Sequence, residues 1–127
     1  MGNILAWVYF VNFVFLANHE IDAAFWKEWD LFRLPGGLNG YLLFNFLVTP
    51  LFAYGLILVF WQTTGGVIFS LIMSFTGIFT FGIHTYFIKK GRDEFNVPMS
   101  LFILRGILIV SLIQGLVAIY ILDIFPK

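Results

Sequence analysis

The ionisable side chains of this sequence gather at a few positions within otherwise apolar runs. His19 and Asp22 follow directly on the first apolar run, and His84 lies near the end of a later one. Two imidazoles with one carboxylate form a donor set typical of catalytic zinc, which combines three protein ligands with a water molecule. We therefore predict that these three residues hold a divalent metal ion such as zinc.

Such a site would activate water against a lipid-borne ester, amide or phosphate. Glu20 is then the candidate general base, and Arg105 the candidate partner of an anionic headgroup or an oxyanion. The pattern differs from the His-Glu-x-x-His motif of zinc proteases, because the fourth residue after His19 is Ala23. Haem ligation by the two histidines is less favoured, because a neutral apolar pocket suits haem better than adjacent acids do.

A purely structural role explains the same residues. Asp22 or Glu20 could pair with Arg105, and the histidines could hydrogen-bond to the acids, which would lock the helix packing. The protein would then be a non-enzymatic accessory or structural subunit of a larger membrane complex, or a homo-oligomer, with the cluster as a buried salt-bridge network. The sequence leaves both alternatives open.

The elements that must position these side chains are membrane-spanning helices. The chain has 127 residues, of which 61% are hydrophobic and 11% are charged, whereas soluble domains carry about 25% charged residues. Four apolar stretches reach the length of about 20 residues that a bilayer requires. The predicted class is therefore all-α, a polytopic integral membrane protein with one domain over residues 1–127. The predicted spans are residues 2–22, 38–61, 67–88 and 100–122.

Charge and cysteine content exclude several function classes. The formal net charge is zero, so the chain lacks the basic surface with which proteins bind nucleic acid. The sequence has no cysteine, which excludes disulfides, thiolate metal sites and iron–sulfur clusters. The lipid bilayer is the partner that the composition itself predicts.

Basic residues in short loops predict the orientation of the spans. The loops after the first and third spans carry five of them, and the opposite side carries only Lys127. We therefore expect both loops in the cytoplasm and both termini on the non-cytoplasmic side. The five basic loop residues are Lys27, Arg33, Lys89, Lys90 and Arg92.

At about 1.5 Å per helical residue, polar groups from all four spans share a depth of roughly 5–12 Å from the cytoplasmic interface. One polar layer is therefore predicted there, while Gln114 stands alone in the outer half of the bundle. The layer would contain His19, Glu20, Asp22, Asn45, His84 and Arg105.

Helical spacing gives two further expectations. His19, Asp22, Trp26 and Trp29 fall on one face of a helix, so the first helix is expected to continue past its polar residues. Small residues repeat on the third and fourth spans, which allows close backbone approach in lipid. These small residues are Gly66, Ser70, Ser74 and Gly77, followed by Ser111, Gly115 and Ala118.

The run His19-Glu20-Ile21-Asp22-Ala23, followed by Glu28-Trp29, resembles the signature of an uncharacterised family of small bacterial four-helix membrane proteins. The resemblance extends to a histidine near the end of the third span, here His84. It implies an integral protein of the bacterial inner membrane and draws attention to Glu28 and Trp29 beside the residues already named. The family implies no established activity.

Overall fold

The computed structural model describes residues 2–92 and 96–124 of the chain. In those residues all regular structure is helical, which confirms the all-α class. Four helices are long and apolar enough to cross a membrane, as predicted. The helices are α1 (Gly2–Phe25), α2 (Glu28–Leu31), α3 (Gly37–Phe60), α4 (Thr64–Lys89) and α5 (Pro98–Ile124).

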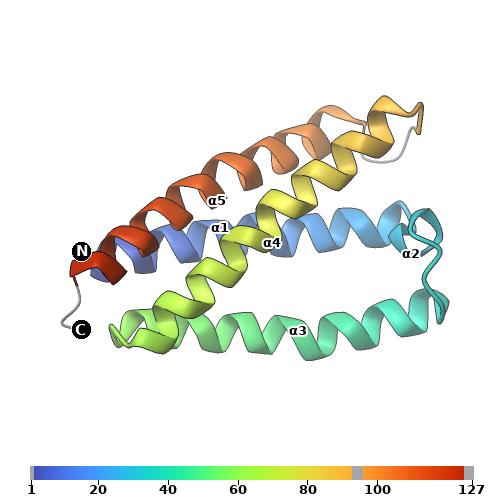
Figure 1. Ribbon diagram of the computed structural model, residues 1–127. Coiled ribbons are helices and arrows are strands. Elements are labelled where there is room, and N and C mark those ends of the chain that lie inside the picture. The colour runs from blue at the N-terminus through green and yellow to red at the C-terminus, as the bar shows by residue number, and fades with distance from the viewer. Residues whose placement is uncertain (1, 93–95, 125–127) are drawn as a thin grey trace.

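The four long helices run up and down, so the start of α1 and the end of α5 lie at one end of the bundle (Figure 1). The short helix α2, the end of α4 and the start of α5 lie at the opposite end. This arrangement agrees with four spans and puts the basic loops together. The side of the membrane that each end faces stays a prediction, and Lys127 lies outside the described residues.

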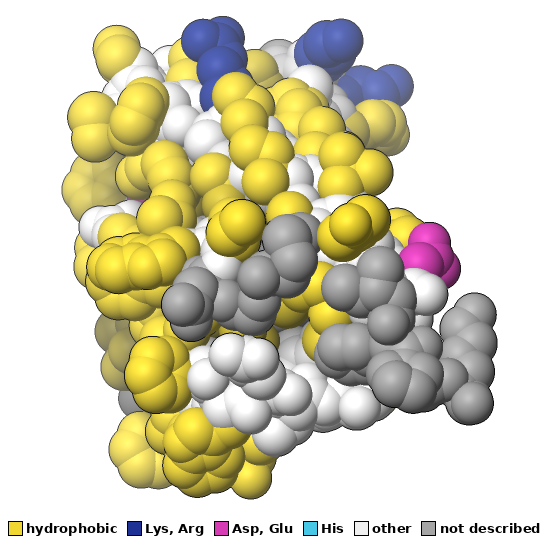
Figure 2. Space-filling view, turned by 90° about the vertical axis from the view of Figure 1, so that its left-hand side faces the viewer, with side chains coloured by type: hydrophobic (Ala, Val, Ile, Leu, Met, Phe, Trp, Pro, Cys, Tyr) yellow, Lys and Arg dark blue, Asp and Glu magenta, His cyan; other side chains and the backbone are white. Residues whose placement is uncertain are grey.

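Membrane helices form here because a bilayer offers no water to backbone N–H and C=O groups, which an α-helix satisfies internally. The bundle turns large hydrophobic side chains outward, among them Trp7, Phe46 and Leu116, each at least 69% exposed. Hydrophobic side chains cover much of the face that Figure 2 shows, and Lys and Arg gather at one edge of it. An exposed apolar surface of this extent is suited to lipid.

The small residues of α4 and α5 pack these two helices closely, as the sequence predicts. Ser74 Oγ donates a hydrogen bond of 2.6 Å to the backbone oxygen of Ser111. A Cβ atom on Gly115 would lie 2.7 Å from Ser74 Oγ, and one on Gly77 would overlap Ser111 Oγ. Larger side chains at these positions would push the two helices apart.

The expectation that Gln114 stands alone in the outer half is wrong. Asn12 Nδ2 donates to Gln114 Oε1 at 2.6 Å and to Ser111 Oγ at 3.0 Å, and all three residues are fully buried. Asn12 lies on α1 and the other two on α5. The hydrogen bonds therefore tie α1 to α5 away from the histidines. They satisfy Asn12 Nδ2 and Gln114 Oε1, whereas Asn12 Oδ1 and Gln114 Nε2 are buried without a partner among the described residues.

Candidate metal site

The first helix continues through its polar residues, as expected, but it ends at Phe25 and does not reach Trp29. Lys27 then adopts left-handed backbone angles of φ 54° and ψ 58°. A non-glycine residue pays roughly 1–2 kcal/mol for this conformation, and the chain turns sharply there. The four-residue helix α2 begins directly afterwards at Glu28.

Aromatic packing holds α2 against the bundle. The Trp29 ring lies 5.3 Å from the Tyr41 ring of α3, measured between centroids. Both residues belong to a buried apolar cluster with Ala23 of α1, Leu31 of α2 and Leu104 of α5. Burial of these side chains offsets the backbone cost at Lys27. As a result, Glu28 is held close to the end of the bundle at which α1 ends.

Glu28 faces the two histidines of the chain. Its Oε1 atom lies 2.8 Å from His84 Nε2 and 3.6 Å from His19 Nε2. The imidazoles meet edge to face, with 4.6 Å between ring centroids. Both histidine side chains are 2% exposed and that of Glu28 is 12% exposed. Three separate helices, α1, α2 and α4, therefore bring one donor each to a buried point.

A contact with the backbone of its own helix fixes the ring orientation of His84. Its Nδ1 atom lies 2.7 Å from the backbone oxygen of Thr80, one helical turn earlier. Because a carbonyl oxygen only accepts hydrogen bonds, Nδ1 carries the proton and donates it. Nε2 is then the ring nitrogen that points toward Glu28 Oε1, and it must lose any proton that it carries before it can bind a metal ion. Metal-bound histidines almost always have such a partner on the second nitrogen.

The charge state of Glu28 follows from its neighbours. Burial by itself would raise the pKa of this carboxyl, which belongs to α2 and lies outside the long spans. The polar contacts and charges of His19 and His84 outweigh burial and lower its pKa from 4.5 to about 2. Glu28 is therefore a carboxylate at neutral pH, which is the form that ligates metal ions.

The three donor atoms lie close enough together to be candidate ligands of one metal ion. One ligand atom each from His19, Glu28 and His84 lies within 4.8 Å of the others. Tetrahedral zinc with bonds of 2.0–2.1 Å separates its ligands by about 3.3 Å. The two separations from Glu28 Oε1, 2.8 and 3.6 Å, lie on either side of that value, so the side chains would have to move to hold the ion.

The predicted ligand Asp22 is not part of this group. Its Oδ1 atom accepts a hydrogen bond of 2.8 Å from Trp26 Nε1. Its Oδ2 atom is buried and has no hydrogen-bond partner among the described residues. Glu28, and not Asp22, therefore supplies the carboxylate that faces both histidines.

Arg105 lies apart from the cluster as well. Its side chain is exposed on α5, and it forms no ion pair with Asp22 or Glu20. The salt bridges that the described residues do form at this depth join Glu28 to the two histidines. A role for Arg105 toward an anionic headgroup stays a prediction.

Glu20 lies beside the cluster and is held by α3. Its Oε2 atom accepts a hydrogen bond of 2.6 Å from the Tyr41 hydroxyl. Asn45, predicted for the same layer, donates instead to the backbone oxygen of Tyr41 at 3.0 Å. A cavity of about 440 Å³ is lined by Glu20 and by all three members of the cluster. Glu20 can therefore face a molecule that also reaches the donor atoms.

Reasoning from residue types and helical spacing missed Glu28. A helix continued beyond Phe25 would not turn its chain back under His19 and His84. The available signal was the Glu28-Trp29 pair, to which the family resemblance drew attention. In the structure Glu28 supplies the carboxylate, and Trp29 supplies the packing that holds it.

Comparison with known proteins gives one match. A family of unknown function (DUF6713) matches residues 5–121, which is nearly the whole chain. No curated protein matches the chain, and no solved structure matches it. The match agrees with the resemblance to an uncharacterised family. The chain belongs to this family of unknown function.

Proposed function

We propose that this integral membrane protein binds a divalent metal ion, with zinc as the best candidate, through His19, Glu28 and His84. The observation that carries the proposal is the meeting of three buried donor atoms from three helices within 4.8 Å. Two imidazoles and one carboxylate suit zinc better than magnesium or calcium, which prefer all-oxygen sites. Three protein ligands leave room for a water molecule.

The chemistry that such an ion supplies is a more acidic bound water and a polarised carbonyl or phosphoryl oxygen. Glu20 lines the same cavity and is the proposed general base. At the inner end of the bundle the site would meet lipid-borne esters, amides or phosphates of the cytoplasmic leaflet. Arg105, exposed on α5, is proposed to bind headgroup phosphates by extending along the helix toward the interface.

The second candidate is a non-enzymatic subunit in which the cluster is purely structural. The distance of 2.8 Å between Glu28 Oε1 and His84 Nε2 favours it, because it is that of a direct hydrogen bond. In this alternative, Glu28 pairs with a protonated His84 and ties α2 to α4. The two candidates differ in whether the folded protein takes up a metal ion.

Calorimetric titration of the chelator-treated protein with Zn²⁺ in detergent micelles distinguishes the two candidates. We expect one ion per chain, and an affinity at least about tenfold lower for Glu28→Gln. Asp22→Asn is the matched control, because it removes a carboxylate at the same depth that does not face the histidines. The wild type taking up no zinc, or Asp22→Asn losing as much affinity as Glu28→Gln, would overturn the proposal.

A further inference from the structure

The cavity beside the donor atoms adjoins a second one, with which it shares part of its lining. The second cavity, of about 320 Å³, shares Glu20, Phe44, Thr76 and Thr80 with the first. Beyond these shared residues its walls are mainly apolar side chains of α1, α3 and α4. We call the two together the inner groove, whose deep part is lined by Leu16, Val48, Phe52 and Met73.

The inner groove has the length of one leaflet. Along α4 it extends from His84 to Met73, a separation of eleven residues or about 16 Å at 1.5 Å per residue. The hydrocarbon core of a bilayer is about 30 Å thick, so one leaflet fills about 15 Å. A groove with polar donors at one end and an apolar end near the bilayer centre therefore matches one lipid chain and its linkage to the headgroup.

The inner groove is open to the bilayer along its side. Phe44 of α3 and Phe79 of α4 line the first cavity and are 55% and 57% exposed. They therefore form a rim between the cavity and the surrounding lipid. Figure 1 shows α4 crossing away from α3 toward this end of the bundle. A lipid chain can enter sideways without leaving the hydrocarbon.

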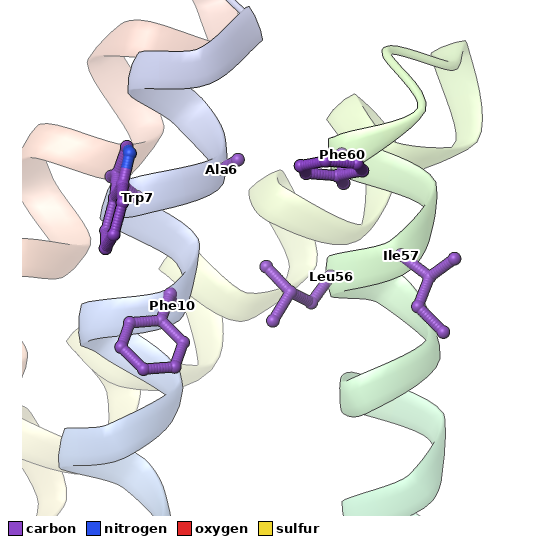
Figure 3. A pocket seen from close by; sticks show the side chains of 6 residues that line it. All are labelled: Ala6, Trp7, Phe10, Leu56, Ile57 and Phe60. Carbon is purple, nitrogen blue, oxygen red and sulfur yellow. The ribbon is translucent and has the colours of Figure 1, made fainter.

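A second apolar groove lies toward the other end, between α1 and α3 (Figure 3). Its volume is about 440 Å³, and none of its lining residues is titratable. It offers apolar contact but nothing to recognise a polar linkage. We call it the outer groove, which is lined by Ala6, Trp7, Phe10, Leu56, Ile57 and Phe60.

We infer that the inner groove binds one acyl chain of a membrane phospholipid, with the ester or phosphate linkage against the cluster of His19, Glu28 and His84. This inference rests on the proposed function, because it names phospholipids as the substrate class of the proposed metal site. The apolar wall selects a long chain, and the donors select an oxygen-rich linkage. The apolar residues of the deep wall determine where the chain lies, and the polar residues at the other end of the groove are those of the proposed metal site.

Photolabelling with a lipid probe tests the inference. The protein is placed in vesicles of phosphatidylethanolamine and phosphatidylglycerol, with a trace of phosphatidylglycerol that carries a diazirine at the acyl-chain end. After irradiation, mass spectrometry locates the labelled residues. We expect labelling to concentrate on the deep wall, at Val48, Phe52 and Met73. Labelling spread evenly over the outward-facing side chains of α3 and α4 would overturn the inference.

Replacing one alanine of each groove with phenylalanine gives the matched comparison. Ala17 lines the inner groove and Ala6 lines the outer one. Ala17→Phe is expected to lower labelling of the deep wall about tenfold, because a phenyl ring competes with the chain for space. Ala6→Phe is expected to leave that labelling unchanged. Equal labelling in both variants would refute the inference.

Zinc titration of the same samples separates this inference from the proposed function. The wild type could bind no zinc and still show deep-wall labelling that Ala17→Phe abolishes. That result would support the lipid groove and reject the metal site. Zinc binding with evenly spread labelling would reject the lipid groove alone. Wild-type labelling is read position by position, so the first test does not depend on the folding of either variant.

Discussion

Replacing Glu28 with glutamine removes the carboxylate that faces both histidines and keeps the size of the side chain. The folded protein lowers the pKa of Glu28 from 4.5 to about 2. At about 1.4 kcal/mol per pKa unit, this difference corresponds to roughly 3 kcal/mol of stability that the carboxylate contributes. We expect Glu28→Gln to lose about that amount near neutral pH, in the presence of a chelator.

The lowered pKa of Glu28 also predicts how the stability difference between wild type and Glu28→Gln changes with pH. Because the folded-state pKa is the lower one, the contribution is complete above the unfolded pKa near 4.5. It is lost as the pH falls toward about 2, because both states then bind the proton. The stability difference between wild type and Glu28→Gln should therefore shrink as the pH falls below 4.5.

The assay is unfolding by added SDS in mixed micelles, followed by circular dichroism at several pH values. Asp30→Asn is the control, because Asp30 lies two residues further along α2 and is exposed. Exposed acids contribute little, so Asp30→Asn should stay within about 0.5 kcal/mol of wild type. Equal stabilities of the two variants near neutral pH, or a difference that does not change with pH, would refute the reasoning.

Two further predictions concern the packing of the long helices. Gly66→Ala should lower the free energy of unfolding by about 2 kcal/mol, because the added Cβ would lie 2.6 Å from backbone atoms of Val59. Gly82→Ala is the control and should be neutral or slightly stabilising, because nothing lies within 4 Å of its added Cβ. Gln114→Leu should cost about 1 kcal/mol, because it removes the acceptor of the 2.6 Å hydrogen bond from Asn12. Thermal unfolding in detergent checks both, and a destabilised Gly82→Ala or a neutral Gln114→Leu would contradict them.

The sequence predicts the four long helices because an apolar stretch of about 20 residues is enough to identify a membrane-spanning helix. It does not predict the break after Phe25, since neither Gly nor Pro marks that position. Lys27 takes left-handed angles there because α2 gains buried contacts through Trp29 and Tyr41. These contacts join distant parts of the chain, so helical spacing within one segment carries no information about them.

The sequence predicts the level of the site along the helices but not which side chains face it. Depth in the membrane follows from counting residues, and it correctly brought His19 and His84 to one level. Depth leaves open which way a side chain faces around its helix. On α5 the buried stripe passes through Leu104, Ile107 and Ser111, and Arg105 is rotated about 100° away from it. Only the packed bundle shows that Arg105 faces outward.

Metal content of the natively loaded protein tests the central claim most directly. The chain is expressed without a polyhistidine tag, purified in mild detergent without chelating resin, and analysed by elemental mass spectrometry beside Glu28→Gln and His84→Ala. We expect close to one zinc or other divalent transition metal ion per wild-type chain, and its loss in both variants while their helices remain folded. A folded wild type without metal, or variants that retain the same metal content, would contradict the account.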